Sequence, residues 1–355
     1  MPERFVRPDV STDEGGLWAV IDREEAKLRR SHFMIRDPAL RDYLQNMVAK
    51  LAGPHIEDIR VYPMRLPYFN ASMYPNGMMQ VWSGLLLRAE NEAQLASVVG
   101  HEIAHFVQRH SIARWRDLKS RAAVVSLVGW AGVPGLLGQL ALTAGMGMYS
   151  RDHEREADAV GLALMQNAGY DPTQASQMWA QLRAELAAGT AGEPAAQRNA
   201  LFASHPPSDE RQATLEKFAA GRSGERGEDR FQQAIAGILP DLLDDELKRA
   251  QYDESIALFT RLCSARPQVG ALRHARGEAY RLRAKDGDEA LAEADYRVAL
   301  ASAQAPAAAH RSLAFLHRQR GDKAAAAEAF KQYLHVAPQA PDAGLIQSFI
   351  SELTS

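Results

Sequence analysis

Apolar residues recur at two different spacings along the first third of the chain. Between residues 17 and 52, and again from Asn91 to Trp115, they recur every three or four positions, which predicts amphipathic helices. Between these segments, apolar runs stand on both sides of the turn sequence Pro75-Asn76-Gly77. Such runs around a turn are typical of paired strands, so we expect a small antiparallel sheet here.

Residues 122–150 contain no charged side chain, and the segment is long enough to cross a bilayer once. Glycine and proline interrupt it, however, and both residues break long helices. We therefore expect two short helices folded back on each other. A further helix over residues 151–168 should end at Gly169, which is followed by Pro172.

Beyond residue 228 the sequence repeats itself in helical units. Phe259 precedes Pro267 by eight residues, and Phe330 precedes Pro338 by the same eight. A looser copy ends at Pro306, and the spacing of the three prolines brackets the period of about 34 residues of the tetratricopeptide repeat, which the pattern resembles. The helix pairs of such repeats stack because no pair buries its apolar face alone. An irregular helical bundle with the same alanine-rich pattern is the alternative.

Composition narrows the classes of function. The chain has 355 residues and a formal net charge of −3, so it lacks the basic surface of a nucleic-acid-binding protein and we expect no such partner. Cys263 is the only cysteine, which excludes an internal disulfide and a multi-cysteine zinc site. Any metal ion must be held by His, Asp and Glu. The residues from Met1 to Phe5 begin no apolar leader, which indicates a cytosolic protein or a leader that precedes this sequence.

The sequence His101-Glu102-Ile103-Ala104-His105 lies inside a predicted helix. Each helical residue turns by about 100°, so His101 and His105 lie about 40° apart on one face and can bind one metal ion. Two neutral imidazoles suit Zn²⁺, which would activate a water molecule for attack on a carbonyl. Glu102 can reach that water and act as its general base. A helix surface with two unrelated histidines is the alternative.

A catalytic zinc site needs a third protein ligand. On an ideal helix His110 is rotated roughly 140° from His105, so we interpret it as a surface residue of the same helix. Glu154 and Asp158 are better candidates, because side chains four residues apart on the following helix point the same way. Glu154 can bind the metal while Asp158 accepts the second N–H of a ligating histidine. Glu156, about 200° from Glu154, is the competing ligand.

These motifs resemble the M48 family of zinc metallopeptidases, the HtpX-like group, over roughly residues 15–220. Further segments fit the family pattern: Phe69-Asn70-Ala71, Pro75-Asn76-Gly77, Ser83-Gly84-Leu85-Leu86, Asn91 to Ala96, and Ser204-His205-Pro206-Pro207 with Arg211. The resemblance implies a mainly α fold. An α+β zincin-like (gluzincin) peptidase domain with the small antiparallel sheet would form residues 1–225, and a helical tetratricopeptide-repeat domain would form residues 226–355.

The resemblance also implies the metal site of a zinc metalloendopeptidase, with one Zn²⁺ per chain. It carries over His101, His105 and Glu154 as the zinc ligands and Glu102 as the general base. Asp158 is implied as a residue that does not bind the metal itself but accepts a hydrogen bond from a ligating histidine.

Four further residues receive roles by resemblance. The family places a histidine like His205 close to the metal, where it caps the open position or stabilises the transition state; a loop residue ordered by two prolines is the alternative. Arg211 is implied as a second supporting residue behind the ligands. Asn70 and Ala71 should form an edge strand that binds substrate by strand addition, or else a hairpin strand without a ligand.

The implied function is hydrolysis of misfolded or misassembled proteins, of the envelope or outer membrane, in the periplasm. We therefore expect polypeptide substrates and a protein partner that the repeats recruit. The alternative function is a repeat-based chaperone or adaptor with an occluded or silent peptidase site, and the alternative compartment is the cytoplasm.

The apolar segment at residues 122–150 is limited by the geometry of the metal site. If it crossed a membrane once, His101 and His105 would lie on the opposite side from Glu154, and one zinc ion could not bind all three. The segment must therefore return to the side that it left. It then packs on the domain, lines the cleft or contacts a membrane surface.

Overall fold

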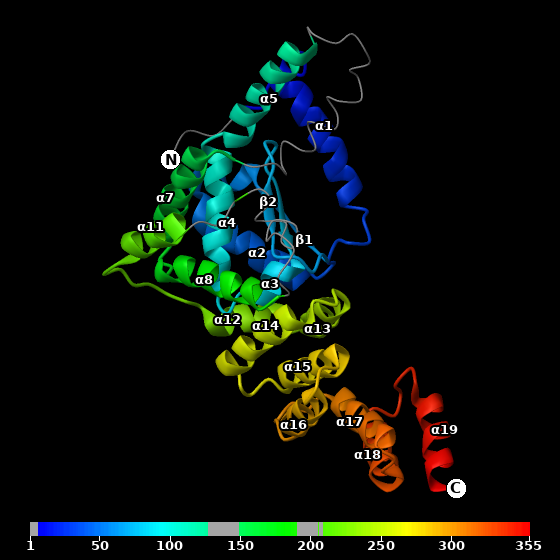
Figure 1. Cartoon of the computed structure of the whole chain (residues 1–355). Helices are drawn as coiled ribbons and strands as arrows, with labels where there is room; N and C mark the ends of the chain where they lie inside the picture. Colours follow the sequence, from blue (N-terminus) through cyan, green and yellow to red (C-terminus); the bar gives the residue numbers. More distant parts are fainter. Residues whose placement is uncertain (1–5, 127–148, 190–204, 206–208) are drawn as a thin grey trace. The chain divides into compact units, whose positions relative to one another are not determined.

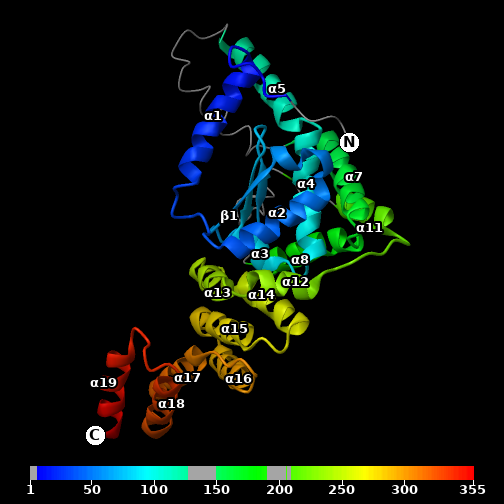
Figure 2. The same cartoon turned by 180° about the vertical axis from the view of Figure 1, so that it is seen from behind.

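The structure is a computed structural model that describes residues 6–126, 149–189, 205 and 209–355 (Figures 1 and 2). The chain divides into two compact units. The first comprises Met1–Arg183 and Gly192–Leu239, and the second comprises Ala184–Ala191 and Pro240–Ser355. Compactness alone does not show that a part folds independently, so the domain boundary between residues 225 and 226 stays a prediction.

A small mixed sheet lies in the first unit. Strands β1 (Arg60–Met64), β2 (Ala71–Met73) and β3 (Met78–Trp82) are arranged in the order β1-β3-β2. β2 and β3 form the predicted antiparallel hairpin, and its turn requires Gly77 because the φ angle there is +86°. β1 runs parallel to β3, so the sheet is mixed and not antiparallel throughout. Apolar spacing marks strands but does not select their neighbours, which is why the direction of β1 was not predicted.

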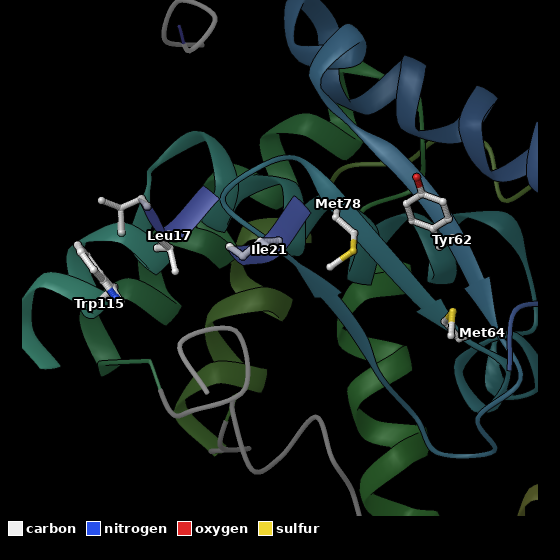
Figure 3. Packing of buried hydrophobic residues seen from close by; sticks show 7 residues of the cluster. Leu17, Ile21, Tyr62, Met64, Met78 and Trp115 are labelled. Atoms are coloured by element: carbon white, nitrogen blue, oxygen red, sulfur yellow. The ribbon is translucent and has the colours of Figure 1, made fainter. Parts of the chain in front are cut away.

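Helix α1 (Asp13–Leu28) packs against this sheet and against α5 (His110–Ser126). It begins at Thr12, whose hydroxyl accepts a hydrogen bond from the Gly15 amide at 3.1 Å. Figure 3 shows side chains of the apolar cluster that joins the three elements: Leu17, Ile21, Tyr62, Met64, Met78, Ile112 and Trp115. Burial of each large apolar side chain contributes about 1.5–3 kcal/mol, so this cluster fixes α1 in place.

An ion-pair cluster attaches the last turns of α1 to the strand β1. Arg60 donates from Nε and Nη2 to the two oxygens of Glu25, both at 2.7 Å. Glu25 also accepts hydrogen bonds from the Tyr62 hydroxyl at 2.6 Å and the Asn76 amide at 2.9 Å. Burial by itself would raise the pKa of Glu25, but the hydrogen bonds from Arg60 and Tyr62 lower it to about 2.

Helices α4 (Glu92–Val107) and α7 (Arg151–Asn167) lie side by side, and α4 also contacts β2 (Figures 1 and 2). The two helices touch where Gly100 faces Gly161. A Cβ atom on Gly161 would lie 3.0 Å from the backbone nitrogen of His101, and one on Gly100 would lie 3.2 Å from the Gly161 carbonyl oxygen. The absence of both side chains therefore permits a close backbone contact at His101.

Further helices pack against α4 and α7. The helix α2 packs against β1 and α4, α12 packs against α2 and α4, and α11 packs against α7. Every residue of α4 is buried as a result. The bounds are α2 (Pro38–Ala52), the 3-10 helix η1 (Gly53–Asp58), α3 (Ser83–Arg88), α8 (Thr173–Ala188), α11 (Asp209–Ala219) and α12 (Glu228–Ile235).

The second unit consists of successive helices in contact, such as α14 with α15, α17 with α18, and α18 with α19. Phe259 and Phe330 are both fully buried. Their helices end alike, at Arg266 (φ −135°, ψ 64°) and Ala337 (φ −129°, ψ 65°). This recurrence is compatible with tetratricopeptide repeats, which stay a prediction. The helices are α13 (Leu239–Lys248), α14 (Tyr252–Ala265), α15 (Gly270–Arg283), α16 (Asp288–Leu300), α17 (Ala307–Gln319), α18 (Lys323–Val336) and α19 (Ala343–Thr354).

The predicted fold class, mainly α with a small sheet, is confirmed. In the described part of the chain, no helix is both long and apolar enough to span a membrane. Most of the apolar segment at residues 122–150 lies outside the described residues, namely residues 127–148. The helical pair expected there therefore stays a prediction.

Candidate metal centre

Helix α4 carries the two histidines of the sequence motif. The helix begins at Asn91, whose side chain accepts a hydrogen bond from the Gln94 amide at 2.9 Å. Three turns further on, His101 and His105 place their Nε2 atoms 3.0 Å apart. Both imidazoles are buried, His105 completely. The helical spacing thus brings two potential ligand atoms together away from solvent.

Two carboxylates of α7 reach these histidines. One oxygen of Glu154 lies 3.3 Å from His105 Nε2, and the other lies 3.5 Å from His101 Nε2. Asp158 Oδ1 lies 2.9 Å from Nδ1 of His101, the ring nitrogen on the other side. Asp158 can therefore accept the Nδ1–H of His101, which leaves the Nε2 lone pair of that ring for a metal ion.

His205 reaches the same point from the segment between α8 and α11. Its Nδ1 lies 2.8 Å from Glu154 Oε1 and 3.2 Å from His101 Nε2. Its Nε2 lies 3.3 Å from Glu102 Oε1, and the residue is 3% exposed. Sequence reasoning left open whether His205 is an ordinary loop residue; the structure brings it together with the residues of α4 and α7.

The geometry of this cluster fits a tetrahedral zinc ion. Ligand atoms of His101, His105, Glu154 and His205 all lie within 4.8 Å of one another. In a tetrahedral site with bonds of about 2.0–2.1 Å, neighbouring ligand atoms are about 3.3 Å apart. The separations given above run from 2.8 to 3.5 Å. Each neutral imidazole carries only one hydrogen, so hydrogens cannot pair every contact among these rings, and a cation would satisfy the converging lone pairs. Imidazole and carboxylate donors suit zinc.

The surroundings hold His105 neutral and Glu154 ionised, which are the forms that bind a metal ion, but they favour a proton on His101. Burial lowers the pKa of His105 well below its usual value, which keeps this imidazole neutral. Burial opposes the charge on Glu154, but the surrounding histidines lower its pKa. Burial and the Arg211 charge lower the pKa of His101, whereas hydrogen bonds to Asp158 and Glu154 outweigh them and raise it to about 9. His101 would therefore release a proton if it bound a metal ion.

Glu102 lies beside the cluster and next to the strand β2. Burial raises the pKa of Glu102, and nearby histidine charges and a hydrogen bond from the Met73 backbone offset this rise only in part. β2 is an edge strand of the sheet; Asn70 precedes it and Ala71 begins it. Among the described residues, no group donates a hydrogen bond to Asn70 Oδ1. The strand expected to bind substrate thus lies against the expected general base.

Arg211 of α11 joins the two carboxylates of α7. Its Nε and Nη2 donate to the oxygens of Asp158 at 2.8 and 2.7 Å, and its Nη1 lies 2.9 Å from Glu154 Oε2. Its guanidinium lies 4.2 Å from the ring centroid of Trp179, an α8 residue that sequence reasoning missed. Burial would raise the pKa of Asp158, but Arg211 lowers it. Arg211 therefore keeps Asp158 ionised as the acceptor for His101.

The interpretation of His110 as a surface residue of the same helix is wrong. The helix α4 ends at Val107, Arg109 has a φ angle of +57°, and α5 begins at His110. His110 is 3% exposed, and its Nδ1 lies 2.9 Å from His105 Nδ1. Neither glycine nor proline marks this break in the sequence. Glu156, the competing ligand, has a half-exposed side chain and contacts His110 at 3.2 Å.

Comparison with known proteins shows the family to which this chain belongs. Residues 35–219, more than half of the chain, match Peptidase family M48. A Beta-barrel assembly-enhancing protease (BepA) of Yersinia pestis is 31% identical over 196 residues, which are 48% of this chain and 40% of that protein. The Escherichia coli K12 protein of the same name is 30% identical over 188 residues, 46% of this chain and 38% of its own length.

A second group of relatives also matches part of the chain. The Mitochondrial metalloendopeptidase OMA1 of Schizosaccharomyces pombe is 34% identical over 161 residues, which are 44% of this chain and 46% of that protein. The matched region thus spans less than half the length of each of these relatives. The expected resemblance is confirmed, and the chain belongs to peptidase family M48.

Proposed function

We propose that this chain is a zinc-dependent metalloendopeptidase. The observation that carries the proposal is the convergence of His101, His105 and Glu154 on one point, with the buried carboxyl group of Glu102 beside it. Membership of family M48 and the names of the relatives, protease and metalloendopeptidase, support it. A zinc ion held by these three ligands would polarise the peptide carbonyl and acidify a water molecule.

Side chains of the protein carry out proton transfer, ligand orientation and stabilisation of the transition state. Glu102 acts as the general base: it takes the proton of the attacking water and returns it to the leaving amine. Burial raises the pKa of Glu102, and this direction of shift favours the return of the proton to the leaving amine. Asp158 and Arg211 hold His101 and Glu154 in their binding orientations. His205 lies within reach of Glu102 and can donate to the oxyanion that develops in the transition state.

The substrates in this proposal are polypeptides bound along β2. An extended chain can add to an edge strand through backbone hydrogen bonds. A substrate strand paired with β2 at Asn70 and Ala71 would run past Glu102, because the Met73 backbone donates to that residue. The proposal assigns recognition mainly to the substrate backbone, which suits an enzyme that cuts unfolded segments of varied sequence.

The biological role rests on the relatives. Several are named for enhancing β-barrel assembly, so we infer misfolded or misassembled envelope proteins as substrates and the periplasm as the compartment. In this account the helical repeats of the second unit recruit a substrate or a protein partner. The matched region covers less than half of each relative. The role in envelope-protein assembly is therefore proposed separately from the peptidase activity.

One observation favours a second function, that of a chaperone or adaptor with an occluded peptidase site. His205 provides a fourth buried donor to the cluster. A zinc ion with four protein ligands is typical of a closed structural site, whereas a catalytic site keeps one position open. In this alternative the repeats bind a partner and no peptide bond is cut.

The test compares the wild type with Glu102→Gln on casein, with zinc measured in both proteins. If the chain is a peptidase, the wild type cleaves casein, the variant is at least about 100-fold slower, and both retain one zinc ion. A zinc-loaded wild type that does not cleave supports the adaptor. The variant His205→Ala then tests whether His205 occludes the site. If this variant cleaves casein and the wild type does not, His205 closes the site in the wild type.

A further inference from the structure

The two histidines of α4 have different partners behind the metal cluster. His101 Nδ1 faces the carboxylate of Asp158 at 2.9 Å. His105 Nδ1 faces a third imidazole instead, because Nδ1 of His110 lies 2.9 Å away. On its other side, His110 Nε2 lies 3.2 Å from Glu156 Oε2. A chain of contacts therefore leads from His105 through the buried imidazole of His110 to a carboxylate at the surface.

One arrangement of hydrogens satisfies all of these contacts. If His105 binds a metal through Nε2, its neutral ring carries the hydrogen on Nδ1. That N–H can donate only to a lone pair, so Nδ1 of His110 must be unprotonated. The hydrogen of His110 is then on Nε2, where it points at Glu156. The other tautomer of His110 would set two N–H groups against each other at 2.9 Å.

The backbone is distorted at the residue that places His110. Arg109 adopts a φ angle of +57°, in the left-handed region that residues other than glycine rarely occupy. On an unbroken helix His110 would be turned roughly 140° away from His105. Arg109 forms an ion pair with Glu14 of α1, so a tertiary contact holds the break. Backbone strain of this kind persists where the surrounding structure enforces it and often serves a site.

Neighbouring rings hold the two imidazoles in this arrangement. His110 stacks on His153, with ring centroids 4.4 Å apart and planes 21° apart. His105 stacks on Tyr149 at 3.9 Å and 22°. Both histidine rings are thus fixed by packing, and the contact between their Nδ1 atoms decides the tautomer.

We propose that His110 is a positioning residue for the metal ligand His105. It accepts the Nδ1–H of His105 and fixes the tautomer and ring orientation in which Nε2 faces the metal. The inference rests on the zinc site proposed above. It adds a ligand partner of a different kind from Asp158, one that orients a ligand without placing a negative charge next to it.

The test measures zinc dissociation constants by competition with a chromogenic chelator. His110→Phe keeps an aromatic ring against His153 but removes the acceptor, and His110→Asn restores an acceptor oxygen near the position of Nδ1. His153→Leu is the matched control, because leucine still packs against the His110 ring and the acceptor stays, while the neighbouring imidazole is removed. We expect a 10- to 100-fold weaker affinity for His110→Phe, recovery of most of the loss in His110→Asn, and a value within about threefold of wild type for His153→Leu.

The same variants separate positioning from general packing. At saturating zinc, His110→Phe should lower kcat on a peptide substrate with little change in KM. Wild-type zinc affinity in His110→Phe, or equal losses in His110→Phe and His110→Asn, would overturn the inference. A wild type that binds no zinc would instead refute the proposed function itself.

A measurement on the wild type does not depend on how the variants fold. Long-range proton–nitrogen correlation spectra of the zinc-loaded chain report which nitrogen of each imidazole carries hydrogen. We expect His110 to be protonated on Nε2 and unprotonated on Nδ1, and His105 to be protonated on Nδ1. A His110 ring protonated on Nδ1 would overturn the inference.

Discussion

Replacing Gly161 with alanine should disturb the helix crossing that holds the metal site together. The new Cβ atom would lie 3.0 Å from the His101 nitrogen and 3.2 Å from the Gly100 carbonyl carbon, whereas ordinary contacts begin at 3.4 Å. Both atoms belong to the backbone, so α4 and α7 must separate by about 0.4 Å or tilt. Zinc ligands tolerate displacements of only about 0.2 Å, and His101 and Glu154 lie on different helices. The substitution should therefore weaken zinc binding as well as folding.

The expected cost follows from two opposing effects. Alanine is favoured over glycine by about 1 kcal/mol in a helix interior, and overpacking typically costs about 1–3 kcal/mol. We expect a net loss of about 1 kcal/mol in the free energy of unfolding by urea, together with weaker zinc affinity in the chelator competition.

A matched control comes from α1. A Cβ atom on Gly16 would meet nothing within 4 Å, so Gly16→Ala should gain up to about 1 kcal/mol with unchanged zinc affinity. The reasoning is refuted if Gly161→Ala is as stable as Gly16→Ala and binds zinc like the wild type.

Three further outcomes follow from the contacts in the first unit. Asp158→Asn should weaken zinc binding about tenfold in the same competition, because the amide still accepts from His101 but no longer balances Arg211; unchanged affinity would argue against the support of His101 by this charge. Glu25→Gln should lose about 2 kcal/mol of unfolding free energy at neutral pH. The pKa of Glu25 is lowered from 4.5 to about 2, so its contribution to stability is complete above pH 4.5 and is lost as the pH falls towards 2. The unfolding free energies of wild type and variant in urea should therefore converge over that range. A difference that persists at pH 2 would refute this role of Glu25. Removal of the metal with EDTA should abolish casein cleavage and lower Tm, and added zinc should restore both, since a ligand that binds only the folded state stabilises it; cleavage that survives complete zinc removal would refute a metal-dependent reaction.

Sequence reasoning predicted those residues of the centre whose relative positions depend on the geometry of a single helix. The spacing of His101 and His105 places both on one face of α4, and the spacing of Glu154 and Asp158 does the same on α7. The contact between α4 and α7 could be expected only because a catalytic zinc site needs a third protein ligand. The glycine at the contact, Gly161, gave no signal of its own, because its effect depends on a helix sixty residues earlier in the chain.

What the sequence did not predict depends on distant contacts. An ideal helix puts His110 on the surface, but Arg109 is paired with Glu14 of α1 and the backbone breaks there without glycine or proline. Trp179 contacts Arg211 of the site from α8, a helix in which the sequence shows no motif. The direction of β1 was missed for a similar reason, because local alternation of apolar residues suits either a parallel or an antiparallel neighbour.

We expect one zinc ion where α4 and α7 meet. Diffraction data collected at the zinc absorption edge, from crystals of the zinc-loaded chain, would locate that ion. A single anomalous peak should lie about 2.0–2.2 Å from His101 Nε2, His105 Nε2 and an oxygen of Glu154. A peak elsewhere in the chain, or zinc-loaded protein with no peak among these three residues, would refute the proposed site.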